Sequence, residues 1–198
     1  MAELARTTKR AADDETEAPK RRRPGATKPN VLVTGTPGVG KTRCAEAVAG
    51  RLGLERIGVS ELAQTLGAHE AWDDERKCHV LDEDAVLDAM EPKLGKGGCV
   101  VDYHACELFP ERWFDLVVVL RAGTEVLYDR LRARNYADSK LQENVQCEIM
   151  QVVLEEARES YAPEIVVELR NETPEDLEAT LSRVATWGEA WARDHGTG

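Results

Sequence analysis

Apolar runs of strand length alternate with segments of helical periodicity from residue 30 onward. The runs that predict strands occupy residues 30–34, 56–58, 99–102, 115–120 and 164–169. Strands alternating with helical patterns indicate βαβ units and a parallel sheet covered on both faces. The pattern therefore predicts an α/β fold with a five-stranded parallel sheet flanked by helices.

The helical segments between these strands are punctuated by capping and breaking residues. Helices are predicted at residues 40–52, 84–94 and 124–132. Ser60 has a side chain suited to cap a further helix that runs through about Leu66. Pro92 lacks a backbone N–H, so we expect it to disturb the end of the 84–94 helix.

Two long stretches complete the pattern. A polar turn at residues 135–138 leads into a helix expected to run unbroken to about Tyr161, whereas the acidic stretch 69–84 is expected to be irregular. Thr173 and Pro174 open a last helix, because proline is favoured in the first turn. Its apolar stripe is expected to face the core, although the two terminal tryptophans also suit docking; the stripe comprises Leu177, Leu181, Val184, Trp187 and Trp191.

The first 29 residues differ in composition from the rest of the chain. They contain almost no large apolar side chain and three prolines, so burial cannot offset the entropy of ordering them. We expect a disordered basic extension at 1–29, followed by one domain at 30–198. Lys9-Arg10 and Lys20-Arg21-Arg22-Arg23-Pro24 have the layout of a two-part nuclear import signal. Nuclear residence is therefore expected, with cytoplasm also possible; the alternative is a solvated basic run.

Charge is divided unevenly along the chain. Residues 1–29 carry eight Lys or Arg and five Asp or Glu, which gives them a net charge of +3. Since the net charge of the whole chain is −11, residues 30–198 have a net charge of −14. An acidic domain repels the nucleic-acid backbone and attracts basic proteins. We therefore expect no extensive direct RNA binding by the body of the protein.

Several other classes of protein are disfavoured. The sequence contains no run of about 18 apolar residues and no secretory signal, so we expect a soluble intracellular protein with no membrane partner. Five cysteines are scattered singly and four histidines lack metal-ligand spacing. Neither a disulfide framework nor a site for a transition metal is predicted.

The segment from Gly35 to Thr42 carries the strongest chemical signal. It satisfies G-x-x-x-x-G-K-[ST] and lies directly between a predicted strand and a predicted helix, the arrangement of a phosphate-binding loop. Lys41 is expected to reach the β- and γ-phosphates of ATP, and Thr42 offers a hydroxyl to Mg²⁺. The residues predicted to bind the nucleotide are Gly35, Pro37, Gly38, Val39, Gly40, Lys41, Thr42, Arg43 and Arg134.

A carboxylate is expected near the magnesium, and Asp102 is the best candidate because it closes the apolar run 99–101. With Thr42, Asp102 would hold Mg²⁺ partly through water; the alternative is an aspartate that caps a turn. His104 lies two residues further on, so strand geometry would place it on the same side. It either positions a water and assists proton transfer, or is structural.

Phosphoryl transfer also needs positive charge over the transferred group. Arg130, Arg132 and Arg134 form the one arginine-dense stretch of the acidic body and are predicted to belong to a lid. Their spacing of two spreads them around a helix, so only one or two can point at a shared site. The carboxylates at 73–75 and 82–84 are interpreted as solvated loop and helix-start charges rather than metal ligands.

These residues together resemble the nuclear adenylate kinase isoenzyme 6 family, whose yeast member is called Fap seven. The resemblance covers nearly all of residues 30–195. Beside the loop that begins at Thr34, its marks are Leu81-Asp82-Glu83-Asp84, Val101-Asp102-Tyr103-His104, Phe109-Pro110-Glu111-Arg112, Leu127-Tyr128, Arg130-Leu131, Arg134-Asn135-Tyr136 and Glu148-Ile149.

The resemblance implies a P-loop nucleoside monophosphate kinase fold and ATP:AMP phosphotransfer with Mg²⁺, together with ATP hydrolysis. It also implies nuclear maturation of the small ribosomal subunit and its 18S rRNA, with a basic ribosomal protein and the pre-ribosomal particle as partners. Lys41, Asp102, His104 and Arg134 carry over as catalytic residues. Residues 58–81 carry over as the segment that binds the nucleoside monophosphate (NMP), and 133–143 as the lid.

Three positions depart from the family pattern. Gln64 stands where the family often has Arg or Lys, at a position suited to the acceptor phosphate, so weaker monophosphate binding is implied. Arg43 replaces a small hydroxyl residue, and Asn135 replaces a glycine after the lid arginine. The alternative function is an ATPase assembly factor that handles a basic ribosomal protein, with little kinase activity. A kinase for a small metabolite is a third possibility, but no acceptor-specific residues for it are evident.

Overall fold

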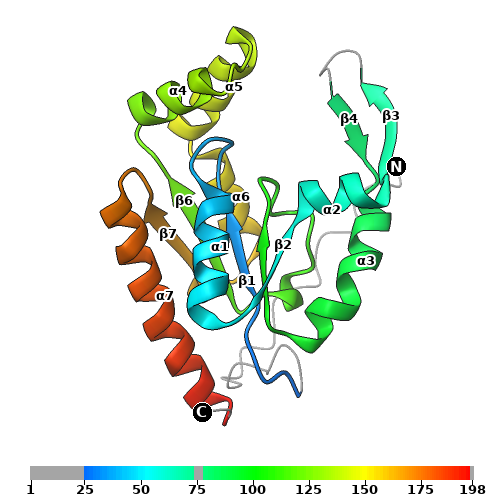
Figure 1. Cartoon of the computed structure of the whole chain (residues 1–198), viewed down its shortest axis with the longest axis vertical. Helices are drawn as coiled ribbons and strands as arrows, with labels where there is room; N and C mark the ends of the chain where they lie inside the picture. Colours follow the sequence, from blue (N-terminus) through cyan, green and yellow to red (C-terminus); the bar gives the residue numbers. More distant parts are fainter. Residues whose placement is uncertain (1–24, 74–77, 197–198) are drawn as a thin grey trace, which may run out of the picture.

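The computed structural model describes residues 25–73 and 78–196, so the candidate import signal lies outside the described residues. A five-stranded parallel sheet with the order β2-β5-β1-β6-β7 forms the centre of the molecule (Figure 1). Its strands are β1 (Val31–Thr34), β2 (Glu55–Gly58), β5 (Cys99–Asp102), β6 (Leu116–Arg121) and β7 (Val166–Arg170). The five predicted strands are all present. The last one begins at residue 166 instead of 164, because Pro163–Ile165 form the 3₁₀ turn η2.

Helices cover both faces of the sheet, as the predicted α/β fold requires (Figure 1). They are α1 (Lys41–Leu52), α2 (Val59–Leu66), α3 (Glu83–Lys96), α4 (Thr124–Ala133), α5 (Asp138–Ile149), α6 (Val152–Ser160) and α7 (Pro174–Asp194), with the 3₁₀ turn η1 at Glu111–Trp113. Alternate residues of β6 enter two separate cores. Val117 packs with side chains of α3 and α6, and Val118 packs with those of α1, α4 and α7.

The predicted long helix up to Tyr161 is in fact two helices, α5 and α6. The chain breaks between them at Met150 and Gln151, where Gln151 takes the left-handed φ of 58°. The prediction was wrong because no Gly or Pro marks the break. The side chain and the carbonyl of Glu148 both accept hydrogen bonds from Arg121 at this point. In a continuing helix, the carbonyl would instead be engaged by the N–H four residues further on.

The acidic stretch 69–84, expected to be irregular, contains an antiparallel pair of strands. These are β3 (His69–Asp73) and β4 (Cys78–Leu81), paired from His69 opposite Leu81 to Asp73 opposite Cys78. The base of this pair is closed by a backbone bond from Asp82 N–H to the carbonyl of Ala68. The sequence pattern missed it because charged residues interrupt any apolar alternation.

Two predictions about helix ends were also wrong. Helix α2 begins at Val59 after Gly58 and has no side-chain cap, so Ser60 lies inside its first turn. Helix α3 continues past Pro92 to Lys96. Its N-cap is Asp82, whose carboxylate accepts a hydrogen bond from the N–H of Ala85 at 3.0 Å, as expected for a helix-start charge.

The last helix meets the core as its periodicity predicted. Leu181, Val184 and Trp191 are buried, and Trp187 packs with Leu181 and Val184 in the core cluster that includes α1. The Trp191 ring stacks on His195 with the ring centres 3.9 Å apart. Trp187 therefore belongs to the core side of α7, and Trp191 is buried beside His195 near the end of the helix. Within the described residues, no helix combines the length and apolar character needed to cross a bilayer.

Candidate functional site

The phosphate-binding loop lies where a parallel sheet most often binds ligands, beyond the carboxyl end of its central strand β1. Gly35 and Gly38 have φ angles of 139° and 99°, which side chains with a Cβ rarely adopt. A Cβ on Gly35 would lie 2.5 Å from the carbonyl oxygen of Leu120, and one on Gly38 would lie 2.7 Å from Leu127. The glycines thus let the loop turn tightly against β6 and α4.

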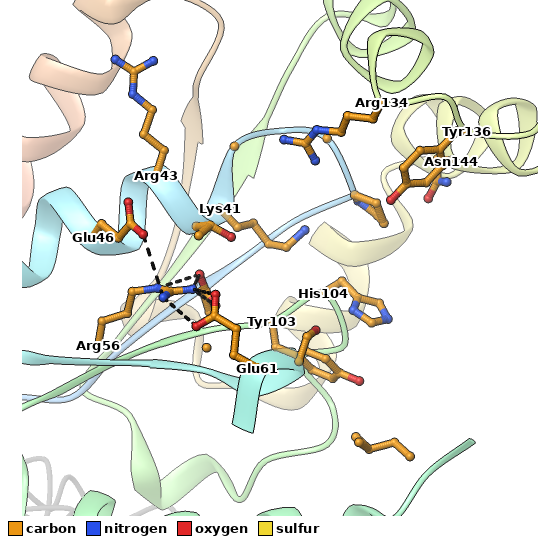
Figure 2. A pocket seen from close by; sticks show the side chains of 18 of the residues that line it. Lys41, Arg43, Glu46, Arg56, Glu61, Tyr103, His104, Arg134, Tyr136 and Asn144 are labelled. Atoms are coloured by element: carbon orange, nitrogen blue, oxygen red, sulfur yellow. Dashed lines mark hydrogen bonds and ion pairs between the residues drawn. The ribbon is translucent and has the colours of Figure 1, made fainter. Parts of the chain in front are cut away.

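Lys41 opens α1 and extends across this loop (Figure 2). Its ammonium donates to the carbonyls of Gly35 at 2.8 Å and Thr36 at 3.2 Å. Burial lowers the pKa of Lys41 to about 8, and the charge of Arg134 acts in the same direction, while Asp102 and Glu148 oppose it. Its hydrogen-bond partners among the described residues are these two carbonyls. A buried cation of this kind gains strongly from a phosphate.

A cavity of about 860 Å³ opens beside this lysine, large enough for a nucleotide-sized ligand. It brings together nine of the residues predicted from the sequence, namely Pro37, Gly38, Gly40, Lys41, Thr42, Arg43, Asp102, His104 and Arg134. Gly35 and Val39 do not line it; Val39 is fully buried in the core. Most of the residues predicted from the sequence therefore line one continuous cavity, whereas Gly35 and Val39 belong to the loop without lining it.

Asp102 is buried at the end of β5, with only 7% of the residue exposed. It is held by Arg56, a residue to which the sequence analysis gave no role. The Arg56 Nε and Nη2 atoms donate to one Asp102 oxygen at 3.2 and 3.0 Å, and Nη2 lies 3.3 Å from the other oxygen. The available signal was a charged residue inside the short strand β2, which borders the site.

His104 lies just beyond β5, and its ring packs against that of Tyr103 with the centres 4.4 Å apart. Partial burial, followed by the charges of Lys41 and Lys140, lowers the pKa of His104 to about 4. His104 nevertheless keeps an exposed surface in the lining of the cavity. His104 is therefore neutral at neutral pH and can accept a hydrogen bond inside the cavity.

The three arginines of the predicted lid divide between different tasks. Arg134, at the end of α4, lines the large cavity. Arg132 is exposed, and Arg130 points to the back of the loop, where it donates to the carbonyls of Asn171 at 3.0 Å and Glu172 at 2.8 Å. Asn135 has a φ of 57°, a left-handed conformation that asparagine adopts more readily than most residues.

A buried acid supports the loop from the opposite side. Glu148 is 4% exposed and accepts hydrogen bonds from the hydroxyl of Thr36, from Arg121 Nε at 2.6 Å and from Ala122 N–H at 3.1 Å. In the sequence, Glu148 stands out only as a mark of resemblance. Its role beneath the loop is not evident there, because the residues bonded to it lie 26 to 112 positions away in the chain.

A second cavity of about 370 Å³ lies between the loop, the end of α4 and the start of α7. Arg43 and Arg134 line both cavities, and Pro174 and Leu177 contribute apolar surface to the smaller one. Asn171 anchors the wall there, because its side-chain N–H donates to the carbonyl of Val39 at 2.7 Å. The two cavities thus meet at the phosphate-binding loop.

On its other side, the large cavity is bounded by the start of α2 and by residues near α3. Gly58, Ser60, Glu61, Leu81, Glu83 and Tyr103 line it there. Gln64 does not: its side chain is exposed and lies outside the lining of either cavity. The departure noted at Gln64 therefore concerns a position outside the lining of this cavity.

Two residues of the cavity carry oxygen groups of the kind that magnesium prefers. Thr42 and Asp102 line the same cavity as Lys41. Mg²⁺ is commonly held by one or two protein groups together with substrate phosphates and water. Within the described part of the chain, no group of three His, Cys, Asp or Glu side chains gathers as a metal site.

The fold is that of P-loop kinases. A gluconokinase from Sinorhizobium meliloti 1021 matches with a TM-score of 0.57 and 20% identity, covering 85% of this chain and 98% of that one. A shikimate kinase from Bacteroides thetaiotaomicron matches with a TM-score of 0.52 and 17% identity, covering 81% of this chain and 98% of that one. At these identities the two structures show the fold alone.

Sequence comparisons are more specific. A family model described as an AAA domain matches residues 31–151. An adenylate kinase isoenzyme 6 homolog from Dictyostelium discoideum is 50% identical over 83% of this chain and 94% of its own length. The homolog from Caenorhabditis elegans is 49% identical over 85% and 93%, and that from Saccharomyces cerevisiae is 46% identical over 86% and 87%. This chain belongs to the adenylate kinase isoenzyme 6 family.

Proposed function

We propose that this protein transfers the γ-phosphoryl group of ATP to AMP, which forms two molecules of ADP. One observation carries the proposal: two cavities, of about 860 and 370 Å³, meet at the phosphate-binding loop. Together they leave room for two nucleotides whose phosphates meet at this loop. The names of the adenylate kinase homologs support the same reaction.

The smaller cavity suits the base of the donor. It adjoins the loop through Gly38 and Gly40, and Pro174 and Leu177 give it an apolar wall. The planar guanidinium of Arg134, which also lines it, is able to stack on a base. Its position at the junction of both cavities also suits a cation that covers the transferred phosphoryl group.

The acceptor is assigned to the α2 side of the large cavity. We infer that residues 58–81 form the segment that binds the monophosphate and that residues 133–143 form the lid. In Figure 1 these segments stand above opposite sides of the sheet, the β3–β4 pair on one side and the α4–α5 junction on the other. Closure of such segments over a substrate excludes water from the transfer.

Each residue of the central site then has a task that its geometry supports. Lys41 neutralises charge on the β- and γ-phosphates, and Arg134 does so on the side of the lid. Thr42 and Asp102 would hold Mg²⁺, partly through water, and the ion would supply charge neutralisation and fix the orientation of the phosphates. Neutral His104 accepts a hydrogen bond from a water or from the acceptor and so positions it.

Lys41→Ala tests the assignment directly. We expect ADP formation from ATP and AMP to fall by at least about a thousandfold, because electrostatic stabilisation is the main source of catalysis in phosphoryl transfer. The fold should persist, since the lysine bonds only to two carbonyls. Coupled assays with purified protein measure the rate, and circular dichroism measures the fold. Unchanged ADP formation in a folded variant would refute the proposal.

A second candidate is an ATPase that assists assembly of the small ribosomal subunit in the nucleus. The observation that favours it is the charge of −14 on residues 30–198, which suits transient shielding of a basic ribosomal protein. In this case the rate of ATP hydrolysis without AMP should increase on addition of the basic partner. Addition of AMP should increase the rate of ATP consumption only slightly. If hydrolysis is instead negligible with and without such a partner, this candidate fails and the kinase stands alone.

A further inference from the structure

An arginine with three acidic neighbours lies on the acceptor side of the large cavity. Arg56 belongs to β2, and its guanidinium contacts carboxylates from three other elements, as the dashed lines in Figure 2 show. Beside Asp102 of β5, it binds Glu61 of α2 at 3.0 Å and lies 3.9 Å from Glu46 of α1. Only 18% of its side chain is exposed.

The surrounding chain leaves space for this guanidinium. Gly58 has a φ of −84°, which any residue adopts, so its backbone does not require glycine. A Cβ at Gly58 would lie 2.6 Å from Arg56 Nη2 and 2.8 Å from the Glu61 carboxylate. The missing side chain at residue 58 thus makes room for the Arg56–Glu61 pair.

Arg56 also stands where an acceptor phosphate needs a cation. It lines the same cavity as Lys41, and Figure 2 places it on the α2 side of the lysine. Gln64 supplies no charge and does not reach this cavity. On the α2 side, Arg56 is therefore the arginine that the described lining offers to an incoming phosphate.

The carboxylates around Arg56 weaken its attraction for a phosphate unless a further cation balances their charge. One guanidinium among the carboxylates of Asp102, Glu61 and Glu46 leaves a local formal charge of about −2, which opposes a phosphate. A divalent cation beside Asp102 would balance that charge. It would also repel the guanidinium away from Asp102 and toward Glu61 and the acceptor side.

We propose that Arg56 is the cation that receives the acceptor phosphate, and that Asp102 and Glu61 make acceptor binding depend on Mg²⁺. The inference rests on the proposed function, because it names the residue that recognises the acceptor in that reaction. It predicts that Mg²⁺ and AMP strengthen each other's binding, since coupling between two sites is reciprocal. It also predicts that neutralising Arg56 and neutralising Glu61, the two partners of one ion pair, change the affinity for AMP in opposite directions.

The test measures the AMP dissociation constant by calorimetry with a non-hydrolysable ATP analogue bound, with and without Mg²⁺. In the wild-type protein, Mg²⁺ should tighten AMP binding by about tenfold, within the range typical of coupled sites. Arg56→Gln should weaken AMP binding about tenfold, with binding of the analogue changed less than about twofold. Glu61→Gln removes a negative charge, so it should instead tighten AMP binding in the absence of Mg²⁺, by roughly fivefold at low salt.

A purely structural ion pair would not give this result, because losing either partner would then disturb the site in the same direction. Arg56→Lys keeps the charge but loses the two-pronged geometry, so it should recover part of the affinity. Gly58→Ala keeps every charge but would place a Cβ 2.6 Å from Arg56 Nη2, so it should displace the guanidinium from its position in the cavity and weaken AMP binding. Arg51→Gln is the matched control, since Arg51 binds Glu178 at 2.8 Å outside the cavity linings.

A second measurement needs neither nucleotide nor metal. Hydrogen–deuterium exchange of the α2 amides in the free protein should rise in Arg56→Gln and stay unchanged in Arg51→Gln, because Arg56 ties α2 to β5. If Arg56→Gln and Glu61→Gln shift AMP affinity in the same direction, or if Mg²⁺ has no effect on wild-type AMP binding, the inference is overturned. A wild-type protein that binds no AMP at all would refute the proposed acceptor itself.

Discussion

Replacing the buried acid beneath the phosphate-binding loop should reveal how much that loop depends on it. Glu148→Gln keeps the size and most of the shape of the side chain but removes its charge. Arg121, which is 19% exposed, would lose the negative charge that lies 2.6 Å from its Nε atom, although the glutamine oxygen can still accept its hydrogen bond. Breaking a buried ion pair from one side costs about 3–5 kcal/mol, because the remaining charge is left unpaired.

The structure argues for a value below the top of that range. Arg121 keeps a second partner, Glu168, at 3.2 Å, and a glutamine at 148 can still accept the Ala122 N–H bond. We therefore expect a loss of about 2–4 kcal/mol. At about 2–4 °C per kcal/mol for a chain of this size, the melting temperature should fall by roughly 4–16 °C.

Thermal unfolding followed by circular dichroism measures this directly, and binding of an ATP analogue measures the effect on the loop. Because Thr36 in the loop also donates to Glu148, analogue binding should weaken as well. Glu168→Gln is the matched control: it removes the other acid bonded to Arg121, but one that is 45% exposed, so about 0–1 kcal/mol is expected. The reasoning is refuted if Glu148→Gln lowers the melting temperature no more than Glu168→Gln does.

Three further outcomes are expected. The pKa of Lys41 is lowered from 10.5 to about 8 in the free protein. Because a lysine must be protonated to bind phosphate, ATP affinity should decline above about pH 8. An ATP affinity that stays unchanged up to about pH 10 would contradict this. The pKa of His104 is lowered to about 4, so His104→Gln should leave the shape of the pH–rate profile between pH 5.5 and 8 unchanged while reducing kcat by roughly tenfold to a hundredfold if the ring positions a reactant. For the import signal, alanines at residues 20–23 should move a fluorescent fusion from the nucleus to the cytoplasm, and an undisturbed nuclear signal would leave only a solvated basic run.

The parts of the site predicted from the sequence are those that lie close together along the chain. The loop from Gly35 to Thr42 is recognisable because a strand, a turn of glycines and a helix follow one another directly. Asp102 and His104 were identified because an apolar run ends at them. In each case, neighbouring residues alone hold the information.

The missed contacts depend on how distant segments are aligned. Arg56 meets Asp102 across 46 positions, and Glu148 meets Thr36 across 112. The first contact depends on β2 pairing with β5 such that Gly58 lies opposite Asp102, a register that the local pattern does not encode. The break at Gln151 is similar, because its cause is the inward turn of Glu148 and not a residue that ends helices by itself.

The bond between Asn171 and Val39 bears on how the protein acquires its nucleotide site during synthesis. Val39 belongs to an early part of the chain, whereas Asn171 follows β7 and directly precedes the last helix. Chains are made from the N-terminus, and segments fold as they emerge. A nascent chain that lacks residues 171–177 would have the phosphate-binding loop but neither its rear anchor nor one wall of the smaller cavity. ATP should therefore help to stabilise the finished protein but not its growing precursor.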